Sequence, residues 1–171
     1  MIPPAQPEES LDRCKPIDLT SDEYFMGEAL RLARVAYEAD EVPVGAVIVH
    51  NGKIVGRAHN QVELLKDATA HAEILAITQA SHALGDWRLE GATMFVTKEP
   101  CPMCAGAIVL SRIRRLVFGT RDERAGAAGS VFDITAGKGL NHSVQVVVGV
   151  KEPEARELLQ SFFREKRNLT P

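Results

Sequence analysis

Two short stretches of the sequence carry residues that can bind a metal ion and move protons. TAHAEILA contains His71 and Glu73 among small apolar residues, and TKEPCPMCAGAI contains Cys101 and Cys104. One histidine and two cysteines are three ligands, the number typical of a catalytic zinc with one position left for water, whereas a structural zinc has four. The remaining cysteine, Cys14, falls outside the expected fold. Glu73 would lie beside the metal as a carboxylate that is free to move protons.

The positions of these residues favour a site at the starts of two helices. Each stretch is expected to begin a helix directly after a loop or a strand, so backbone N–H groups and the positive end of the dipole point at the site. Cys101 and Cys104 are three residues apart and share a helix face, and Pro102 suits the first turn. A helix N-terminus also lowers the pKa of a cysteine toward the thiolate, which is the ligand form.

Taken singly, each stretch has an ordinary interpretation. A lone histidine on a helix is more often a core or surface residue than a ligand, and a C-x-x-C pair can be a redox pair, although no thioredoxin-like pattern surrounds this one. The combination is more specific. H-x-E, followed 27 residues after Glu73 by the Pro100 that opens P-C-x-x-C, is the signature of zinc deaminases.

Hydrophobic periodicity predicts the elements that position the site. A capping box formed by Thr20 and Glu23 precedes an amphipathic helix, helices follow His71 and Cys101, and a last helix has Pro153 in its first turn. Asn51-Gly52 predicts a two-residue turn between the first two of five strands, which are 44–50, 53–59, 92–98, 115–120 and 144–150. Strands interleaved with helices imply one α/β domain with helices on both faces of the sheet.

Composition excludes several classes of protein. The chain has 171 residues, 45% of them hydrophobic and 25% charged, and a net charge of −3, which argues against a generally basic nucleic-acid binder. Basic clusters at 111–124 and 164–167 are either a solvated rim or RNA contacts.

The sequence also predicts where the protein is found. No apolar run suits a membrane span, no leader pattern is present, and three cysteines do not make a disulfide framework, so we expect a cytoplasmic protein with no membrane association. Residues 1–19 contain four prolines and are predicted to be a flexible tail before a folded domain at 20–171.

From about Thr20 to Asn168 the chain resembles the bacterial tRNA-specific adenosine deaminases of the cytidine deaminase-like superfamily. The resemblance rests on EVPVGAVIVH, TAHAE, EPCPMCAGA, RDERAGAAGS, NHSVQV and FFREKR. Ala68 departs from the family, which often has proline there, and TAGKG departs where relatives can carry histidines. The resemblance implies a three-layer α/β/α sandwich around a five-stranded mixed sheet, and a homodimer.

The resemblance also implies the reaction. His71, Cys101 and Cys104 would bind one zinc per subunit, with no organic cofactor. Zinc-bound hydroxide would attack C6 of the wobble adenosine in a tRNA anticodon stem-loop and produce inosine, while Glu73 acts as base and then acid. The zinc motif is shared by the whole superfamily, and the later segments favour the tRNA branch.

Substrate contacts are likewise implied by the resemblance. Asn60 would hydrogen-bond the purine through its amide, and Ala72 would offer a backbone group. The other implied contacts are Val42, Pro43 and Val44 around the base, and Arg121, Asp122, Phe163, Arg164 and Arg167 on flanking nucleotides. Each also has an ordinary interpretation as strand core, turn cap, packed aromatic or solvated charge.

Two rival functions remain open at this point. A deaminase of guanine, cytosine or a pterin-like molecule would keep the same zinc centre, but it would not need the basic clusters. A non-catalytic, zinc-stabilised binding module would have no use for an unliganded carboxylate at Glu73.

Overall fold

A five-stranded mixed sheet forms the middle layer of the computed structural model, which describes residues 18–169, in the order β2-β1-β3-β4-β5. β1 (Gly45–His50) is antiparallel to β2 (Lys53–His59) and to β3 (Thr93–Lys98). β3, β4 (Arg115–Thr120) and β5 (Gln145–Val148) are parallel. All five predicted strands are present, and the predicted mixed sheet is confirmed.

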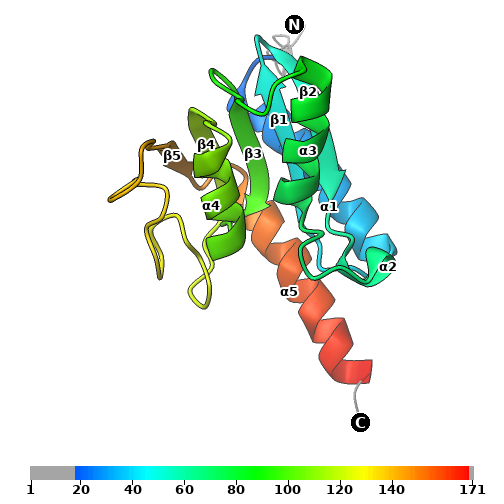
Figure 1. Ribbon diagram of the computed structural model, residues 1–171. Helices are drawn as coiled ribbons and strands as arrows, with labels where there is room; N and C mark the ends of the chain where they lie inside the picture. Colours follow the sequence, from blue (N-terminus) through cyan, green and yellow to red (C-terminus); the bar gives the residue numbers. More distant parts are fainter. Residues whose placement is uncertain (1–17, 170–171) are drawn as a thin grey trace, which may run out of the picture.

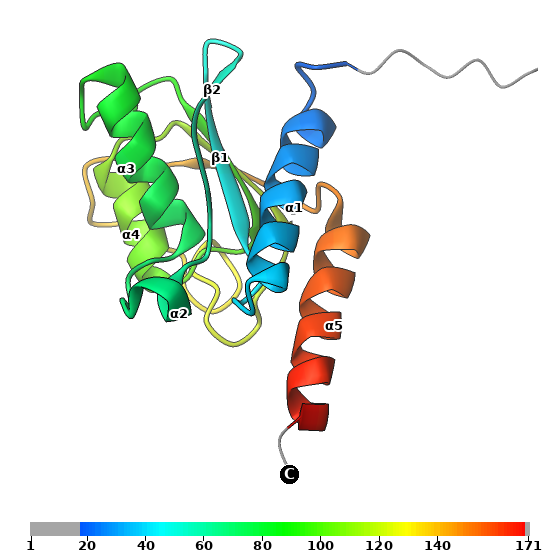
Figure 2. The same ribbon diagram turned by 90° about the vertical axis from the view of Figure 1, so that its right-hand side faces the viewer.

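Helices cover both faces of this sheet, as Figures 1 and 2 show. α1 (Asp22–Glu38) and α5 (Glu152–Leu169) lie on one face, and α3 (Ala72–Leu84) and α4 (Pro102–Leu110) lie on the other. A short helix that the sequence did not predict, α2 (Val62–Leu65), follows β2. The predicted three-layer α/β/α sandwich is confirmed.

The two helical layers face two separate apolar cores. Side chains alternate along a strand, so neighbouring strand residues belong to different cores. Ile48 and Val96 pack toward α3 and α4, whereas Val47, Phe95 and Val117 pack toward α1 and α5. A strand that is buried on both faces has a continuous run of apolar residues in its sequence. This is why these strands could be predicted from the sequence.

The first helix begins one residue later than the predicted capping box requires. Ser21 is the N-cap, and its hydroxyl accepts a hydrogen bond from the Tyr24 N–H at 3.2 Å. The Thr20 backbone N–H and hydroxyl instead donate to the Asp18 carboxylate, at 2.9 and 2.6 Å. The capping box of Thr20 and Glu23 is therefore wrong, because Asp18 competes for the threonine hydroxyl.

The hairpin turn agrees with the sequence. Asn51 and Gly52 both have positive φ angles, 50° and 72°, and His50 pairs with Lys53. Positive φ at both central residues is the geometry of the two-residue turn that matches the twist of paired strands.

Most of the predicted tail, with Cys14, lies outside the described residues, so the boundary at residue 20 remains a prediction. Among the described residues, no helix is long and apolar enough to span a membrane.

The topology brings the functional stretches to one edge of the sheet. β3 and β4 are parallel, so the segments that follow them, which begin near Glu99 and Arg121, leave the same edge. α3 and α4 lie side by side on one face and both begin at this edge (Figure 1). The starts of two helices and the ends of two strands therefore surround one location, as is usual for ligand sites in α/β sheets.

Both helical layers approach the sheet closely at glycines. A Cβ at Gly45 would lie 2.0 Å from the Ala29 carbonyl oxygen of α1, and one at Gly56 would lie 2.4 Å from the Ala76 carbonyl oxygen of α3. These backbone atoms cannot move aside as the end of a flexible side chain can. The absence of a side chain at Gly45 and Gly56 therefore lets α1 and α3 pack this close to the sheet.

We expect Gly45→Ala to lower the free energy of unfolding by about 3 kcal/mol, because α1 must move away from β1. Chemical denaturation measures this change. Gly27→Ala, on α1 itself, is the matched control: its Cβ meets only Lys151 Cε at 4.0 Å, so helix propensity should raise stability by up to about 1 kcal/mol. Equal stability of Gly45→Ala and wild type would contradict the close approach.

Candidate active site

The three predicted metal ligands meet at the N-termini of α3 and α4. His71 is the N-cap of α3 and Cys101 is the N-cap of α4, both with extended backbone, and Cys104 lies in the first turn of α4. His71 Nδ1 is 3.6 Å from Cys101 Sγ and 3.4 Å from Cys104 Sγ. The three ligand atoms all lie within 4.8 Å of one another.

These distances fit a tetrahedral metal ion. With metal–nitrogen and metal–sulfur bonds of about 2.1 and 2.3 Å, the nitrogen–sulfur edge of a tetrahedron is about 3.6 Å. Two thiolates and an imidazole are a donor set that suits zinc, and three donors leave a fourth position. The residues present therefore fit a zinc ion bound through Nδ1 of His71 and both cysteine sulfurs.

The pKa values of the two cysteine thiols are shifted in opposite directions. A hydrogen bond with the Cys104 thiol is the largest cause that lowers the pKa of Cys101 to about 3, and His71 contributes in the same direction. The same pairing, with burial, raises the pKa of Cys104. A thiolate is thus stabilised at this position, and a thiolate is what a soft metal ion binds.

Glu73 is buried in the first turn of α3, with 4% of its surface exposed. Burial raises the pKa of its carboxyl group, while a hydrogen bond from its own backbone N–H and the charge of His71 oppose the rise. Glu73 lines the same cavity as His71 and Cys101. A carboxyl group that can hold a proton next to a reacting centre is suited to acid and base work.

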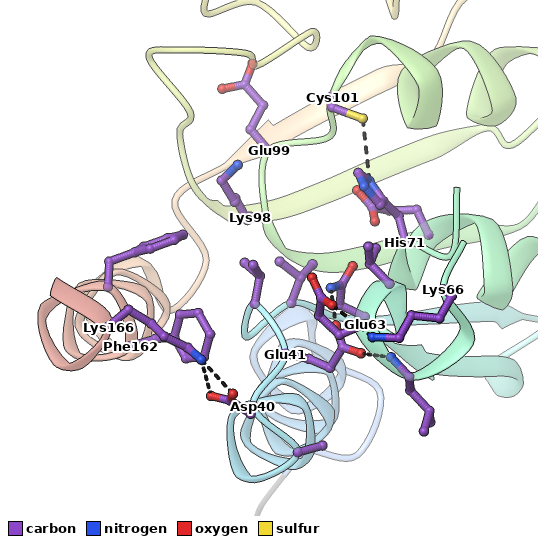
Figure 3. Close-up of a pocket in the computed structure, with 18 residues that line it drawn as sticks. Asp40, Glu41, Glu63, Lys66, His71, Lys98, Glu99, Cys101, Phe162 and Lys166 are labelled. Carbon is purple, nitrogen blue, oxygen red and sulfur yellow. Dashed lines mark hydrogen bonds and ion pairs between the residues drawn. The ribbon is translucent and has the colours of Figure 1, made fainter. Parts of the chain in front are cut away.

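A cavity of about 960 Å³ opens from the cluster toward the ends of α1 and α5 (Figure 3). This volume is at the upper end of the range of small-molecule pockets, so it has room for more than one purine base. Apart from the cluster residues, its walls include polar and charged side chains from four parts of the chain: Asp40 and Glu41, Asn60 and Glu63, Lys98 and Glu99, and Lys166.

The structure brings some of the implied base contacts to this cavity and not others. Val42, Val44, Asn60 and Phe163 line it. Pro43 and Ala72 are buried in the structure and are not among the lining residues, although each is a neighbour in sequence of one that is. Their roles toward a substrate remain predictions.

Asp122 is already bonded within the protein. Its carboxylate is ion-paired with Lys98 and accepts hydrogen bonds from the Arg124 and Ala125 N–H groups at 3.0 and 3.3 Å. Burial acts to raise the pKa of Asp122, but the Lys98 hydrogen bond and the backbone bonds lower it. The Lys98 ammonium, which lines the cavity, is thereby held at its wall.

Glu99 organises the segment that follows β4. Its carboxylate is 2% exposed and accepts N–H bonds from Asp122, Ala128 and Ser130 at 3.0, 3.1 and 3.0 Å, and a bond from the Ser130 hydroxyl. Burial raises the pKa of Glu99, but these bonds outweigh it and the pKa is lowered. One carboxylate thus ties the RDERAGAAGS segment to the strand end that precedes Cys101.

β4 runs through the predicted basic cluster at 111–124 and separates its arginines. Arg115 lies at the beginning of the strand and is ion-paired with Asp22 at 2.6 Å. Arg121 and Arg124 follow its end, about 20 Å away for a six-residue strand. The cluster is therefore not one surface, and only its second part lies at the edge with the site.

The last turns of α5 border the cavity. Phe162, Phe163 and Lys166 line it, and the Lys166 ammonium is 2.5 and 2.6 Å from the Asp40 carboxylate oxygens. The predicted RNA contacts Arg164 and Arg167 are exposed on this helix but are not among the lining residues.

The sequence did not single out several residues that the structure places at the site. Glu41, Lys98, Glu99 and Lys166 line the cavity, yet each sits within a stretch noticed for other residues. For Glu41 the sequence did offer a signal, because it directly precedes an apolar strand. A charged residue buried at such a position is expected to have partners.

The MafB19-like deaminase family model matches residues 20–167, so the fold and the site define a deaminase of this class. The tRNA-specific adenosine deaminase of Bacillus subtilis (strain 168) is 51% identical over 149 residues, 87% of this chain and 92% of the relative. The enzyme of the same name from Aquifex aeolicus (strain VF5) is 51% identical over 146 residues, 85% of this chain and 96% of the relative. The chain therefore belongs to the tRNA-specific adenosine deaminase family, and the resemblance seen in the sequence is confirmed.

Solved structures of deaminases share the fold of this chain. One from a study of A-to-I editing by tRNA:A34 deaminases at the wobble position of transfer RNA has a TM-score of 0.77 and 46% identity, and covers 80% of this chain and 99% of that chain. A guanine deaminase from Nitrosomonas europaea has a TM-score of 0.75 and 26% identity, and covers 87% of this chain and 88% of that chain.

We expect about one zinc ion per chain in the purified protein, measured by atomic emission. His71→Ala and Cys101→Ala should lose most of it, because two ligands hold zinc far more weakly than three. Glu73→Ala should retain it, since Glu73 is not a ligand. Full zinc content in Cys101→Ala would contradict the ligand assignment.

Proposed function

We propose that this protein catalyses the zinc-dependent hydrolytic deamination of adenosine to inosine at the wobble position of a tRNA anticodon. The observation that carries the proposal is the buried Glu73 carboxyl group beside a three-donor cluster, in a cavity with room for a nucleotide. The names of the relatives and of the solved tRNA deaminase support the substrate.

His71, Cys101 and Cys104 would hold a zinc ion in this proposal. A zinc ion held there would lower the pKa of water toward about 7 and so supply a nucleophile at neutral pH. Glu73 accepts the proton of that water and delivers it to the purine ring nitrogen next to C6 as the C6–O bond forms. Glu73 then takes the remaining proton from the oxygen added at C6 and delivers it to the amine, which leaves as ammonia while the C6–O double bond forms, so adenosine and water give inosine and ammonia.

The surroundings of the cluster suit a base that has left its stack. A stacked base cannot reach a recessed centre, whereas the bases of an anticodon loop can be splayed out. Val42, Val44 and Asn60 line the cavity that holds the cluster and are the proposed contacts of the base. Pro43 and Ala72, which are buried next to lining residues in the sequence, are proposed to complete that wall.

Flanking nucleotides are proposed to lie along the open side of the cavity. Phe163 offers a ring that is 44% exposed, and Arg164 and Arg167 offer charges on the same helix end. Arg121 and Asp122 lie at the end of β4 on the same edge of the sheet. Phosphate contacts of this kind supply affinity without reading sequence.

Two rival functions fit the observations less well. The solved guanine deaminase shares the fold but only 26% identity, against 46% for the tRNA deaminase. A purely structural metal site has no use for the buried carboxyl group of Glu73.

We also propose a homodimer in the cytoplasm, where tRNA is available. Large apolar side chains support a self-association surface on and beside α4. Met103 and Leu110 are 36% and 70% exposed on the helix, and Val131 and Phe132 are 46% and 51% exposed in the segment that bonds to Pro100 through Ala127. A second copy of the chain would remove this apolar surface from water.

We expect inosine to form in anticodon stem-loops with adenosine at the wobble position and not in matched stem-loops with adenosine moved one position away. Nuclease digestion and mass spectrometry measure the product.

Glu73→Ala should lose nearly all turnover while it keeps zinc and stem-loop affinity. Free adenosine should be a very poor substrate, since contacts outside the base hold it at the site. Efficient deamination of free adenosine or guanine would contradict the tRNA assignment.

We expect stem-loop affinity to fall steeply with salt, with a log–log slope of about −0.7 for each phosphate neutralised. Arg164→Gln with Arg167→Gln should weaken binding and flatten that slope, as fluorescence anisotropy over a salt series measures. Arg31→Gln is the control, because Arg31 is paired with Glu28 on α1 away from the cavity. An unchanged slope in the double variant would exclude these arginines from phosphate binding.

A further inference from the structure

The buried Glu99 carboxylate is the support of the segment 121–130. All four hydrogen bonds that it accepts within residues 18–169 come from this segment, three from backbone N–H groups and one from the Ser130 hydroxyl. A Cβ at Gly126 would lie 2.5 Å from Cδ and Oε2 of Glu99, so the segment passes directly over the carboxylate. Figure 3 shows this carboxylate pointing away from His71, so it serves the segment and not the metal cluster.

One oxygen of Glu99 fixes Arg121 from two directions. The N–H of the peptide unit that joins Arg121 to Asp122 donates to Glu99 Oε2 at 3.0 Å. At the far end of the side chain, Arg121 Nη1 donates to Ser130 Oγ at 3.3 Å, and the Ser130 hydroxyl donates to the same Oε2. Arg121 is exposed, yet both its backbone and its guanidinium are tied to a buried carboxylate.

We infer that Glu99 is a positioning residue that orients the Arg121 guanidinium to bind a phosphate of a nucleotide that flanks the target base. This inference rests on the proposed function, in which Arg121 contacts such a nucleotide. A guanidinium can bind a phosphate through two parallel N–H groups, so its orientation contributes to affinity as well as its charge. A side chain that is already held in place also loses less conformational entropy on binding.

The substitution Glu99→Gln releases Arg121 selectively. The introduced NH₂ group cannot accept a hydrogen bond, and at the Oε1 position it would face the N–H groups of both Ala128 and Ser130. At the Oε2 position it faces one N–H and the Ser130 hydroxyl, which can turn and accept. The NH₂ group therefore takes the Oε2 position, where the bond from the Asp122 N–H is lost. The start of the segment becomes free while its far end stays tied.

Charge and orientation predict opposite effects of Glu99→Gln on RNA affinity. Removal of a negative charge would by itself strengthen the binding of a polyanion, whereas a misplaced Arg121 weakens it. We expect Glu99→Gln to raise the Kd of the wobble-adenosine stem-loop about 3- to 10-fold, measured by fluorescence anisotropy. Zinc content should be retained, and kcat at saturating stem-loop should stay within about threefold of wild type, because the loss is one of binding.

Glu123→Gln is the matched control for charge. Glu123 is exposed in the same segment, and its carboxylate takes part in none of the hydrogen bonds or ion pairs of residues 18–169. Its substitution removes the same charge without releasing Arg121, so the Kd should not rise. A Kd for Glu99→Gln at or below that of the wild type would overturn the inference, because the effect would then be one of charge alone.

A double-mutant cycle tests whether Glu99 acts through Arg121. Arg121→Gln should raise the Kd about 3- to 10-fold in the wild type but less than about twofold in Glu99→Gln, where the arginine is already misplaced. Arg164→Gln, on α5 and outside this network, should raise the Kd by the same factor in both backgrounds. The inference is wrong if Arg121→Gln has equal effects in the two backgrounds, or if Arg164→Gln is coupled to Glu99→Gln as strongly as Arg121→Gln is.

Amide hydrogen exchange tests the positioning without RNA. In ¹⁵N NMR spectra of the zinc-loaded protein, the Asp122 amide should exchange at least about tenfold faster in Glu99→Gln than in the wild type. The Ala128 amide should keep its rate, and Glu123→Gln should change neither. An unchanged Asp122 rate in Glu99→Gln would also overturn the inference. If the wild type binds no stem-loop, the proposed function fails, and the exchange rates still decide whether Glu99 fixes the peptide that carries Arg121.

Discussion

The contact of one imidazole nitrogen with two cysteine sulfurs is the constraint on which the other features of the site depend. His71 and Cys101 are N-caps of neighbouring helices, so the distances of 3.6 and 3.4 Å from His71 to the sulfurs of Cys101 and Cys104 require α3 and α4 to begin at the same edge of the sheet. Unpaired N–H groups and positive dipole ends then converge where thiolates must be stabilised. The parallel pairing of β3 with β4 adds the strand ends that carry the loops of the site.

Around this centre, carboxylates do three different tasks that their environments separate. Glu73 is buried beside the cluster with a raised pKa, which suits proton transfer. Glu99 is surrounded by hydrogen-bond donors, has a lowered pKa, and holds a loop. Glu41 holds a side-chain amide. A carboxylate that receives several donors becomes structural, whereas one with few donors keeps a proton available.

The sequence predicted the layers and the metal cluster because these follow from local patterns. The five strands are apolar runs or alternating segments, and the His71 and Cys101 stretches carry a spacing specific enough to identify the cluster. The N-cap was misplaced by one residue, since Asp18 competes for Thr20 and nothing in the local pattern ranks the two partners. The partners of Glu41, Lys98 and Glu99 are 19 to 31 residues away in the chain, so only the fold reveals them. The separation of the arginines in the 111–124 cluster likewise became clear only once β4 was located between them.

The most direct test of the central account is the origin of the oxygen in the product. The zinc-loaded protein is incubated with a wobble-adenosine anticodon stem-loop in water enriched in ¹⁸O, and the inosine is analysed by mass spectrometry. Attack by water at C6 beside Glu73 predicts that every inosine formed carries one oxygen from the labelled solvent, and that ammonia is released in equal amount. Inosine without the label, or loss of adenosine without ammonia, would contradict hydrolytic deamination at this cluster.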